Sequence, residues 1–186
     1  FSETANGTYV QTHQTINGCD SIITLNLTVN TNPIIALTPT DVTCYGYSNG
    51  IIAANVTGGS GSYSYSWSNT SQTTATINSL EPNIYNVTVT DNTTACTSTA
   101  TINIEQPDAM SIPITHNDVQ CGISLGNASV NVSGGEPPYT YHWSNGDTGS
   151  SVENLMRGEY SVTVTDANQC TLSQSFRIRN IGIVSA

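Results

Sequence analysis

An internal repeat is the strongest constraint on how this chain of 186 residues can fold. Six landmarks of one segment return in the same order in the next, at offsets of 77, 76, 76, 75, 75 and 74 residues. They are Cys44, Gly58-Gly59, Trp67, Tyr85, Asp91 and Cys96, followed by Cys121, Gly134-Gly135, Trp143, Tyr160, Asp166 and Cys170. The offset drifts by one residue at a time, as single-residue changes in loop length would produce. A period of this length predicts two similar domains, over residues 34–106 and 109–183.

Each repeat shows the polar–apolar alternation of β-strands. Residues 63–67 place two tyrosines and a tryptophan on one face, and residues 85–89 place a tyrosine and two valines on one face. Further strands of the first repeat are expected at residues 34–42, 51–57, 75–77 and 100–104, and the second repeat follows the same scheme. No segment has a convincing helical period. About six or seven short strands in roughly 75 residues predict an all-β fold, a small β-sandwich.

Two aromatic positions refine the fold class. Trp67 and Trp143 fall in the third strand of each repeat, where a tryptophan packs on the opposite sheet at the centre of a sandwich. The spacing Leu80-x4-Tyr85, repeated as Leu155-x4-Tyr160, resembles the tyrosine corner of immunoglobulin-like domains, whose hydroxyl anchors a Greek-key crossover. We therefore expect tandem immunoglobulin-like (Greek-key) β-sandwich domains.

The stripe of Tyr139, Tyr141 and Trp143 has two interpretations. It could form a platform on which sugar rings stack, or it could fill the core. We favour the core, because a small sandwich needs large side chains to fill its interior.

Charge excludes several classes of partner. Charged residues make up 9% of the chain, with 13 acidic residues, 3 arginines, no lysine and a net charge of −10. Nucleic-acid binding requires clustered Lys and Arg and is not expected. No apolar run approaches the ~20 residues of a transmembrane helix, so membrane insertion is not expected either. Five cysteines on a polar, Thr- and Asn-rich chain indicate a secreted protein in an oxidising compartment.

The cysteines recur in pairs, two in each repeat. The simplest pairing is Cys44 with Cys96 and Cys121 with Cys170, each closing a loop of about 50 residues worth roughly 4 kcal/mol. The alternative is that all four are free and buried. Metal binding is not expected, because no Cys-x-x-Cys motif occurs and no histidine lies near either pair.

Cys19 has no counterpart in the repeats. It lies in residues 1–30, which read as two strands joined by a loop that contains Asn17-Gly18. Two strands do not form a stable domain alone. We therefore expect residues 1–30 to be the C-terminal end of a truncated β domain, with Cys19 unpaired in this fragment.

Two segments of the second repeat resemble the SprB repeat. One is residues 118–146, with Asp-Val-Gln-Cys at its start and Gly-Gly-Glu-Pro-Pro-Tyr-Thr-Tyr-His-Trp-Ser-Asn-Gly at its end. The other is residues 158–170, Gly-Glu-Tyr-Ser-Val-Thr-Val-Thr-Asp-Ala-Asn-Gln-Cys. The first repeat departs at residues 59–62, Gly-Ser-Gly-Ser, and at residues 83–84, Asn-Ile. The Asn-Gly-Cys-Asp-Ser segment at residues 17–21 resembles another repeat common in the same secreted proteins.

The SprB resemblance implies a location and a class of function. SprB repeats occur in giant surface adhesins of Bacteroidota, including the gliding-motility adhesin, which are exported by type IX secretion. The implied partners are neighbouring repeats, the type IX secretion and surface-anchoring machinery, and surface glycans. We expect structural and adhesive repeats of an extracellular surface protein, with no catalytic site and no cofactor. The alternative is an accessory carbohydrate-binding module of a secreted hydrolase.

Four aspartates are candidate cation ligands. Asp41 and Asp118 precede the first cysteine of each repeat by three residues, and Asp91 and Asp166 end the Tyr-Val-Val strand. If the cysteine pairs form, two carboxylates could meet at one pole of each domain and bind Ca²⁺. We favour the interpretation that each aspartate caps a turn, because two carboxylates are few and no Asp-x-Asp-x-Asp-Gly loop occurs.

The remaining candidates are weaker. His13, His116 and His142 are expected to face solvent, and none lies at metal-ligand spacing. The glycine-rich segment 58–61 is expected to be a turn, since a strand rather than a helix follows it. Ser21, in Asp-Ser-Ile, matches a short O-glycosylation motif used by Bacteroidota.

Overall fold

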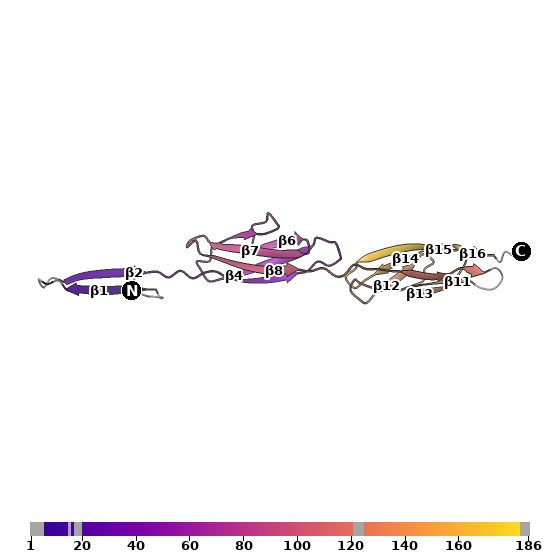
Figure 1. Cartoon of the computed structure of the whole chain (residues 1–186), viewed down its shortest axis with the longest axis horizontal. Coiled ribbons are helices and arrows are strands. Elements are labelled where there is room, and N and C mark those ends of the chain that lie inside the picture. The colour runs from indigo at the N-terminus through magenta and orange to yellow at the C-terminus, as the bar shows by residue number, and fades with distance from the viewer. Residues whose placement is uncertain (1–5, 15, 17–19, 121–124, 183–186) are drawn as a thin grey trace. The chain divides into compact units, whose positions relative to one another are not determined.

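The computed structural model describes residues 6–14, 16, 20–120 and 125–182, which form strands and loops with no helix among them (Figure 1). It follows that no described segment is a helix able to span a membrane. The prediction of an all-β chain is confirmed.

The first repeat contributes six strands that match the predicted ones closely. They are β3 (Ile34–Thr40), β4 (Gly50–Thr57), β5 (Tyr63–Trp67), β6 (Thr76–Leu80), β7 (Asn83–Asp91) and β8 (Thr97–Ile104). They form two sheets, with the strand orders β3-β4-β6 and β5-β7-β8. The chain changes sheet three times, between β4 and β5, between β5 and β6, and between β6 and β7, which is the crossover pattern of a Greek-key sandwich.

The second repeat has the same plan. Its strands are β9 (Ile114–Asn117), β10 (Val119–Gln120), β11 (Gly126–Val130), β12 (Thr140–Trp143), β13 (Ser151–Leu155), β14 (Gly158–Thr165), β15 (Thr171–Ile178) and β16 (Asn180–Ile181). The sheets are β13-β11-β9 and β12-β14-β15, and the short strand β10 pairs in parallel with β16. The antiparallel register of β14 and β15 runs from Gly158 opposite Ile178 to Thr165 opposite Thr171.

The predicted alternation fills both sandwiches. The inward valines of β7 and β14, among them Val87 and Val162, are fully buried. Trp143 is 1% exposed and meets Phe176 edge-on, with ring centroids 5.9 Å apart. Its indole N–H donates to the Gly149 carbonyl at 2.7 Å, and Trp67 donates in the same way to Thr74 at 3.0 Å. Each tryptophan therefore lies in the core with its one polar atom satisfied.

The tyrosine corner is present in the second repeat. The hydroxyl of Tyr160 donates to the carbonyl of Met156, four residues upstream, at 3.1 Å. This bond ties the start of β14 to the turn that brings the chain over from β13, which is the role predicted for it.

The N-terminal segment forms a separate two-stranded sheet. β1 (Gly7–Gln14) and β2 (Asp20–Leu27) pair antiparallel, with Thr12 opposite Ile22. Ser21, the predicted glycosylation site, is exposed on β2. Cys19 lies outside the described residues, and the assignment of this segment to a truncated domain stays a prediction.

Internal contacts divide the chain into two compact units. The first comprises Phe1–Thr38, Ala53–Ile77 and Tyr85–Ile102, and the second comprises Pro39–Ile52, Asn78–Ile84 and Asn103–Ala186. This division does not follow the predicted limits of 34–106 and 109–183, which stay a prediction. The second unit contains both Cys44 and Cys170.

Candidate functional site

A buried aspartate ends the Tyr-Val-Val strand of each repeat. Asp91 is fully buried, and its carboxylate accepts hydrogen bonds from the Ser60 N–H (2.5 Å), the Ser60 hydroxyl (2.7 Å), the Thr93 N–H (2.8 Å) and the Thr94 N–H (3.0 Å). Asp166 is 2% exposed and accepts from the N–H groups of Glu136 (3.0 Å) and Cys170 (2.8 Å). In both repeats the carboxylate therefore joins two loops that are distant in sequence.

The ring of donors shifts the titration of Asp91. The hydrogen bond from the Ser60 N–H, followed by the bond from its hydroxyl, holds the pKa of Asp91 well below its usual range. Burial acts in the opposite direction, since desolvation favours the neutral acid, and the amides of Thr94 and Thr93 lower the pKa further. Asp91 is thus an ionised carboxylate whose charge is stabilised by backbone N–H groups and by the Ser60 hydroxyl.

The double glycine is required by this carboxylate. Gly59 and Gly135 have φ values of +63° and +66°, which side chains rarely adopt. A Cβ atom at Gly59 would lie 2.4 Å from Asp91 Oδ2, and one at Gly135 would lie 2.9 Å from Asp166 Oδ2. The glycine-rich segment is therefore a turn, as predicted, and its glycines make room for the aspartate.

Sequence reasoning missed a second tie to the same loop. The hydroxyl of Tyr63 donates to the Gly58 carbonyl, and the hydroxyl of Tyr139 donates to the Gly134 carbonyl at 2.8 Å. The signal was available, because a tyrosine follows the first glycine by five residues in both repeats.

The disulfide is not the one predicted. Cys44 is bonded to Cys170, 126 residues away, and Cys96 is free. The predicted Cys44–Cys96 bond is therefore wrong, and so is the assignment of Cys170 to Cys121. Cys121 itself lies outside the described residues. The bond links the segment after the first strand of one repeat to the loop before the last strand of the next.

Strand direction explains the error. The Val42 N–H donates to the carbonyl of Glu105, which directly follows β8, whereas Cys96 directly precedes β8. An eight-residue strand spans roughly 25 Å, whereas a disulfide requires Cα atoms within about 7 Å. The two cysteines of one repeat therefore belong to opposite ends of its last strand.

Two segments meet at the disulfide. The Asn168 side-chain amide donates to the carbonyl of Thr43 at 3.1 Å. The Thr43 N–H donates to Asn49 Oδ1 at 3.1 Å, and the Tyr47 N–H donates to the Cys44 carbonyl at 3.1 Å, so a tight turn presents Cys44. Beside the bond lies a cavity of about 190 Å³. Its wall includes Tyr45, Tyr47, Pro107, Met110 and Leu172.

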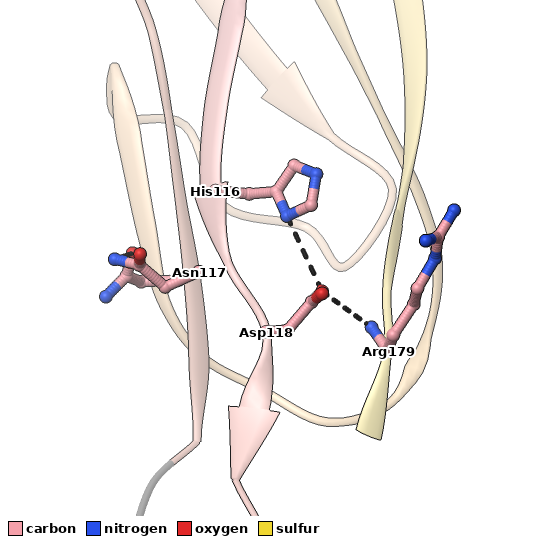
Figure 2. A network of polar contacts seen from close by, with 5 residues as sticks. His116, Asn117, Asp118 and Arg179 are labelled. Atoms are coloured by element: carbon pink, nitrogen blue, oxygen red, sulfur yellow. Dashed lines mark hydrogen bonds and ion pairs between the residues drawn. The ribbon is translucent and has the colours of Figure 1, made fainter. Parts of the chain in front are cut away.

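The aspartates before the first cysteines have another role. Figure 2 shows Asp118 between His116 and Arg179. Asp118 Oδ1 accepts the backbone N–H of Arg179 at 2.8 Å and lies 3.6 Å from His116 Nδ1. Asp41 accepts the N–H of Glu105 in the same way, at 2.8 Å. Each of these aspartates therefore connects the segment after the first strand of its repeat to the residue that follows β8 or β15.

The carboxylates do not meet as a calcium site would require. Asp118 accepts the N–H of Arg179, which directly follows the end of β15, whereas Asp166 accepts the N–H of Cys170, which directly precedes the start of β15. Nowhere in the described part of the chain do three His, Cys, Asp or Glu side chains gather to hold a metal ion. The favoured turn-cap interpretation is correct for Asp91 and Asp166. It is wrong for Asp41 and Asp118, which accept the N–H of the residue that follows β8 and β15, respectively.

The other predicted residues fall mostly where expected. His13 and His142 are exposed, and His116 is exposed as well, although its ring lies 5.4 Å from that of Phe176. Tyr139 and Tyr141 are half-buried and pack against the core cluster that contains Trp143. The stripe is therefore core, and the sugar-platform interpretation does not apply to it.

The family comparison matches the repeat just described. Two segments, residues 36–72 and 114–148, match the family model described as SprB repeat. The chain carries two SprB repeats. Both matched segments of these SprB repeats include the double-glycine loop and the strand that ends in the buried tryptophan. No curated protein sequence matches the chain.

Solved structures give the fold of the SprB repeats. The chain is similar to three N-terminal domains of the highly immunogenic outer capsid protein of bacteriophage RB49, with 18% identity, a TM-score of 0.50, and coverage of 80% of this chain and 59% of that one. It is also similar to the eight N-terminal Ig domains of Down syndrome cell adhesion molecule, with 15% identity, a TM-score of 0.52, and coverage of 95% and 28%. The chain spans less than two thirds of either structure. These likenesses show an immunoglobulin-like β-sandwich fold, as predicted.

Two glycines test the steric role of the carboxylate. Gly59 and Gly61 both have positive φ, +63° and +87°, but a Cβ at Gly61 meets nothing within 4 Å. Each alanine substitution therefore carries a backbone cost of about 1–2 kcal/mol, and only Gly59→Ala also displaces Asp91. We expect Gly59→Ala to lower the urea midpoint clearly more than Gly61→Ala. Equal losses would show that the contact with Asp91 is unimportant.

Acid titration tests the Asp91 cage. Because its pKa is lowered on folding, Asp91 contributes stability that is complete above its unfolded pKa, about 3.9, and is lost as the pH falls through the folded value. We expect unfolding free energy, measured by urea denaturation, to fall steadily below about pH 4. In Asp91→Asn the stability should be lower at pH 7 and should depend less on pH in the acid range. An unchanged acid slope in the variant would contradict the role of the cage.

Proposed function

We propose that these repeats are structural and adhesive domains of a large secreted protein displayed on a bacterial cell surface. The observation that carries the proposal is the Cys44–Cys170 bond, because it joins two successive SprB repeats covalently. On the chain-entropy model, a cross-link across 126 residues contributes about 5 kcal/mol. That is comparable with the whole net stability of a small domain.

The surface chemistry supports an extracellular setting. Disulfides persist in oxidising compartments, and a chain with 13 acidic residues and no lysine resists both self-association and tryptic cleavage. Export by type IX secretion, attachment to its anchoring machinery and a link to gliding belong to the same proposal, and they rest on the SprB resemblance.

A second function is favoured by one feature. Tyr45 and Tyr47 are 58% and 56% exposed beside the cavity of about 190 Å³. Exposed aromatic rings next to a cavity suit the stacking of a sugar ring, as in an accessory carbohydrate-binding module of a secreted hydrolase. The wall of this cavity also includes Asp108.

Single-molecule stretching tests the mechanical proposal. With tension applied between the termini, the disulfide bypasses the residues between Cys44 and Cys170. About 125 residues at ~3.4 Å each, roughly 430 Å of chain, should stay hidden until a reductant is added. A Cys44→Ser variant should lack that step and extend fully with or without reductant. If the oxidised wild-type chain also extends fully, the covalent link between repeats is absent.

Glycan binding separates the two functions. On a glycan array, the structural and adhesive proposal expects no binding that depends on Tyr45 and Tyr47. It also expects an antibody to the chain to label intact, unpermeabilised cells of its source. Binding of a defined glycan that is lost in Tyr45→Ala and Tyr47→Ala, but kept in the distant Tyr141→Phe, would favour the carbohydrate-binding module. Failure to label intact cells would contradict surface display.

A further inference from the structure

We propose that Cys96 is the attachment point for another SprB-type repeat, whose counterpart of Cys44 forms a disulfide with it. Successive repeats would then be linked head to tail, the first cysteine of each bonded to the second cysteine of the next. This inference rests on the proposed structural function and specifies its partner.

Cys96 occupies the same structural position as Cys170. The N–H of Asp91 donates to the Cys96 carbonyl at 2.9 Å, and the N–H of Asp166 donates to the Cys170 carbonyl at 3.0 Å. The residues just before the cysteines, Ala95 and Gln169, both have positive φ, +58° and +66°. Each cysteine directly precedes the last strand of its sandwich.

The aspartate cage around the two cysteines is also shared. The N–H of Asn92 donates to the Ser62 carbonyl at 2.9 Å, and that of Ala167 donates to the Glu136 carbonyl at 2.8 Å. The loop that presents the cysteine is therefore held to the double-glycine loop in both repeats. The Cys170 N–H donates directly to Asp166 Oδ1 at 2.8 Å, whereas the Cys96 N–H donates to the Thr94 hydroxyl at 3.3 Å. The Thr94 N–H in turn donates to Asp91, so Asp91 holds Cys96 through Thr94.

Of these two equivalent cysteines, only Cys170 is bonded to another cysteine within the part of the chain that the structure describes. Cys170 is bonded to Cys44, whereas Cys96 is free and half-buried. The bond at Cys170 is the observation that identifies the ligand: it is a cysteine placed, like Cys44, on the turn after the first strand of a repeat. For Cys96 the corresponding residue would belong to a repeat on its N-terminal side.

The segments leading into the two sandwiches make matching contacts. The Thr31 hydroxyl oxygen accepts the N–H of Gly59 at 3.2 Å, and the Asp108 carbonyl accepts the N–H of Gly135 at 2.9 Å. In both repeats, therefore, the linker that leads into the sandwich contacts the double-glycine loop. A preceding repeat would approach Cys96 along the same route that the first repeat takes to Cys170.

The two positions also differ in the length of one loop and in one neighbouring side chain. The loop from Asp91 to Cys96 is one residue longer than that from Asp166 to Cys170. Ser98 stands where Leu172 lines the cavity beside the existing disulfide. The contact at Cys96 is therefore more polar, and its covalent bond carries a larger share of the attachment.

The bond forms by thiol–disulfide exchange. Oxidised glutathione, or the disulfide of an extracellular oxidoreductase, accepts the two electrons. The Cys96 thiolate attacks that disulfide and releases one thiol, and the incoming cysteine thiolate then attacks the mixed disulfide at Cys96 and releases the second. Two protein thiols become one disulfide, and one oxidant disulfide becomes two thiols.

The test adds a repeat to the whole chain. A copy of residues 34–106 followed by residues 30–33 is inserted after Pro33, which reproduces the natural linker, and the inserted copy carries Cys96→Ser so that a single Cys96 remains. The protein is refolded in a glutathione redox buffer, and Cys96 is labelled with a maleimide and quantified by mass spectrometry. We expect labelling to fall at least tenfold relative to a control whose inserted copy also carries Cys44→Ser. Equal labelling of Cys96 in the two proteins would overturn the proposal.

Peptide mapping of the same non-reduced samples separates the possible failures. A Cys96 peptide linked to the inserted Cys44 peptide supports the proposal. A Cys96 peptide linked to Cys19 or Cys121 contradicts it. If Cys44–Cys170 is present while Cys96 is free, the head-to-tail link fails and the proposed structural function stands. If Cys44–Cys170 is also missing, the proposed function loses its supporting observation.

Discussion

One buried carboxylate organises the end of each sandwich on which the candidate site is built. Asp91 and Asp166 lie buried at the end of the Tyr-Val-Val strand, and each accepts hydrogen bonds from backbone N–H groups of two loops. The double glycine, the tyrosine that bonds it and the position of the second cysteine all follow from this arrangement. At Asp91 the ionised carboxylate is held by three N–H groups and by the Ser60 hydroxyl, which together favour its charged form.

The sequence was sufficient for the parts of the fold that depend on local alternation. Every strand expected in the first repeat is present, and Trp67, Trp143 and Tyr160 have the roles that their spacing indicated. Periodicity of two reports which face of a strand is buried, and in this chain the apolar residues are few and regularly placed. The double-glycine turn was predictable for the same local reason.

Predicting which cysteines and which carboxylates meet requires knowing the direction of each strand. The alternation of polar and apolar residues does not encode that direction. Pairing Cys44 with Cys96, and Asp118 with Asp166, each assumed that two residues of one repeat meet at one pole. The last strand separates them, since one member of each pair lies at its start and the other near its end. Equal counts in each repeat suggested bonds within repeats, but equal counts are also what bonds between successive repeats produce.

Whether a disulfide lies within one repeat or between two repeats changes how the chain responds to tension. A disulfide inside one sandwich would shorten only the chain that this domain can release under force. The observed bond spans 126 residues, which exceeds the spacing of 74 to 77 residues between repeats. In an array built with the same bond at every joint, consecutive spans would therefore overlap, and every interior position of the backbone would lie within at least one span. A single proteolytic cut in such an array would leave its two parts covalently joined, so resistance to both tension and proteases would come from the same placement of cysteines.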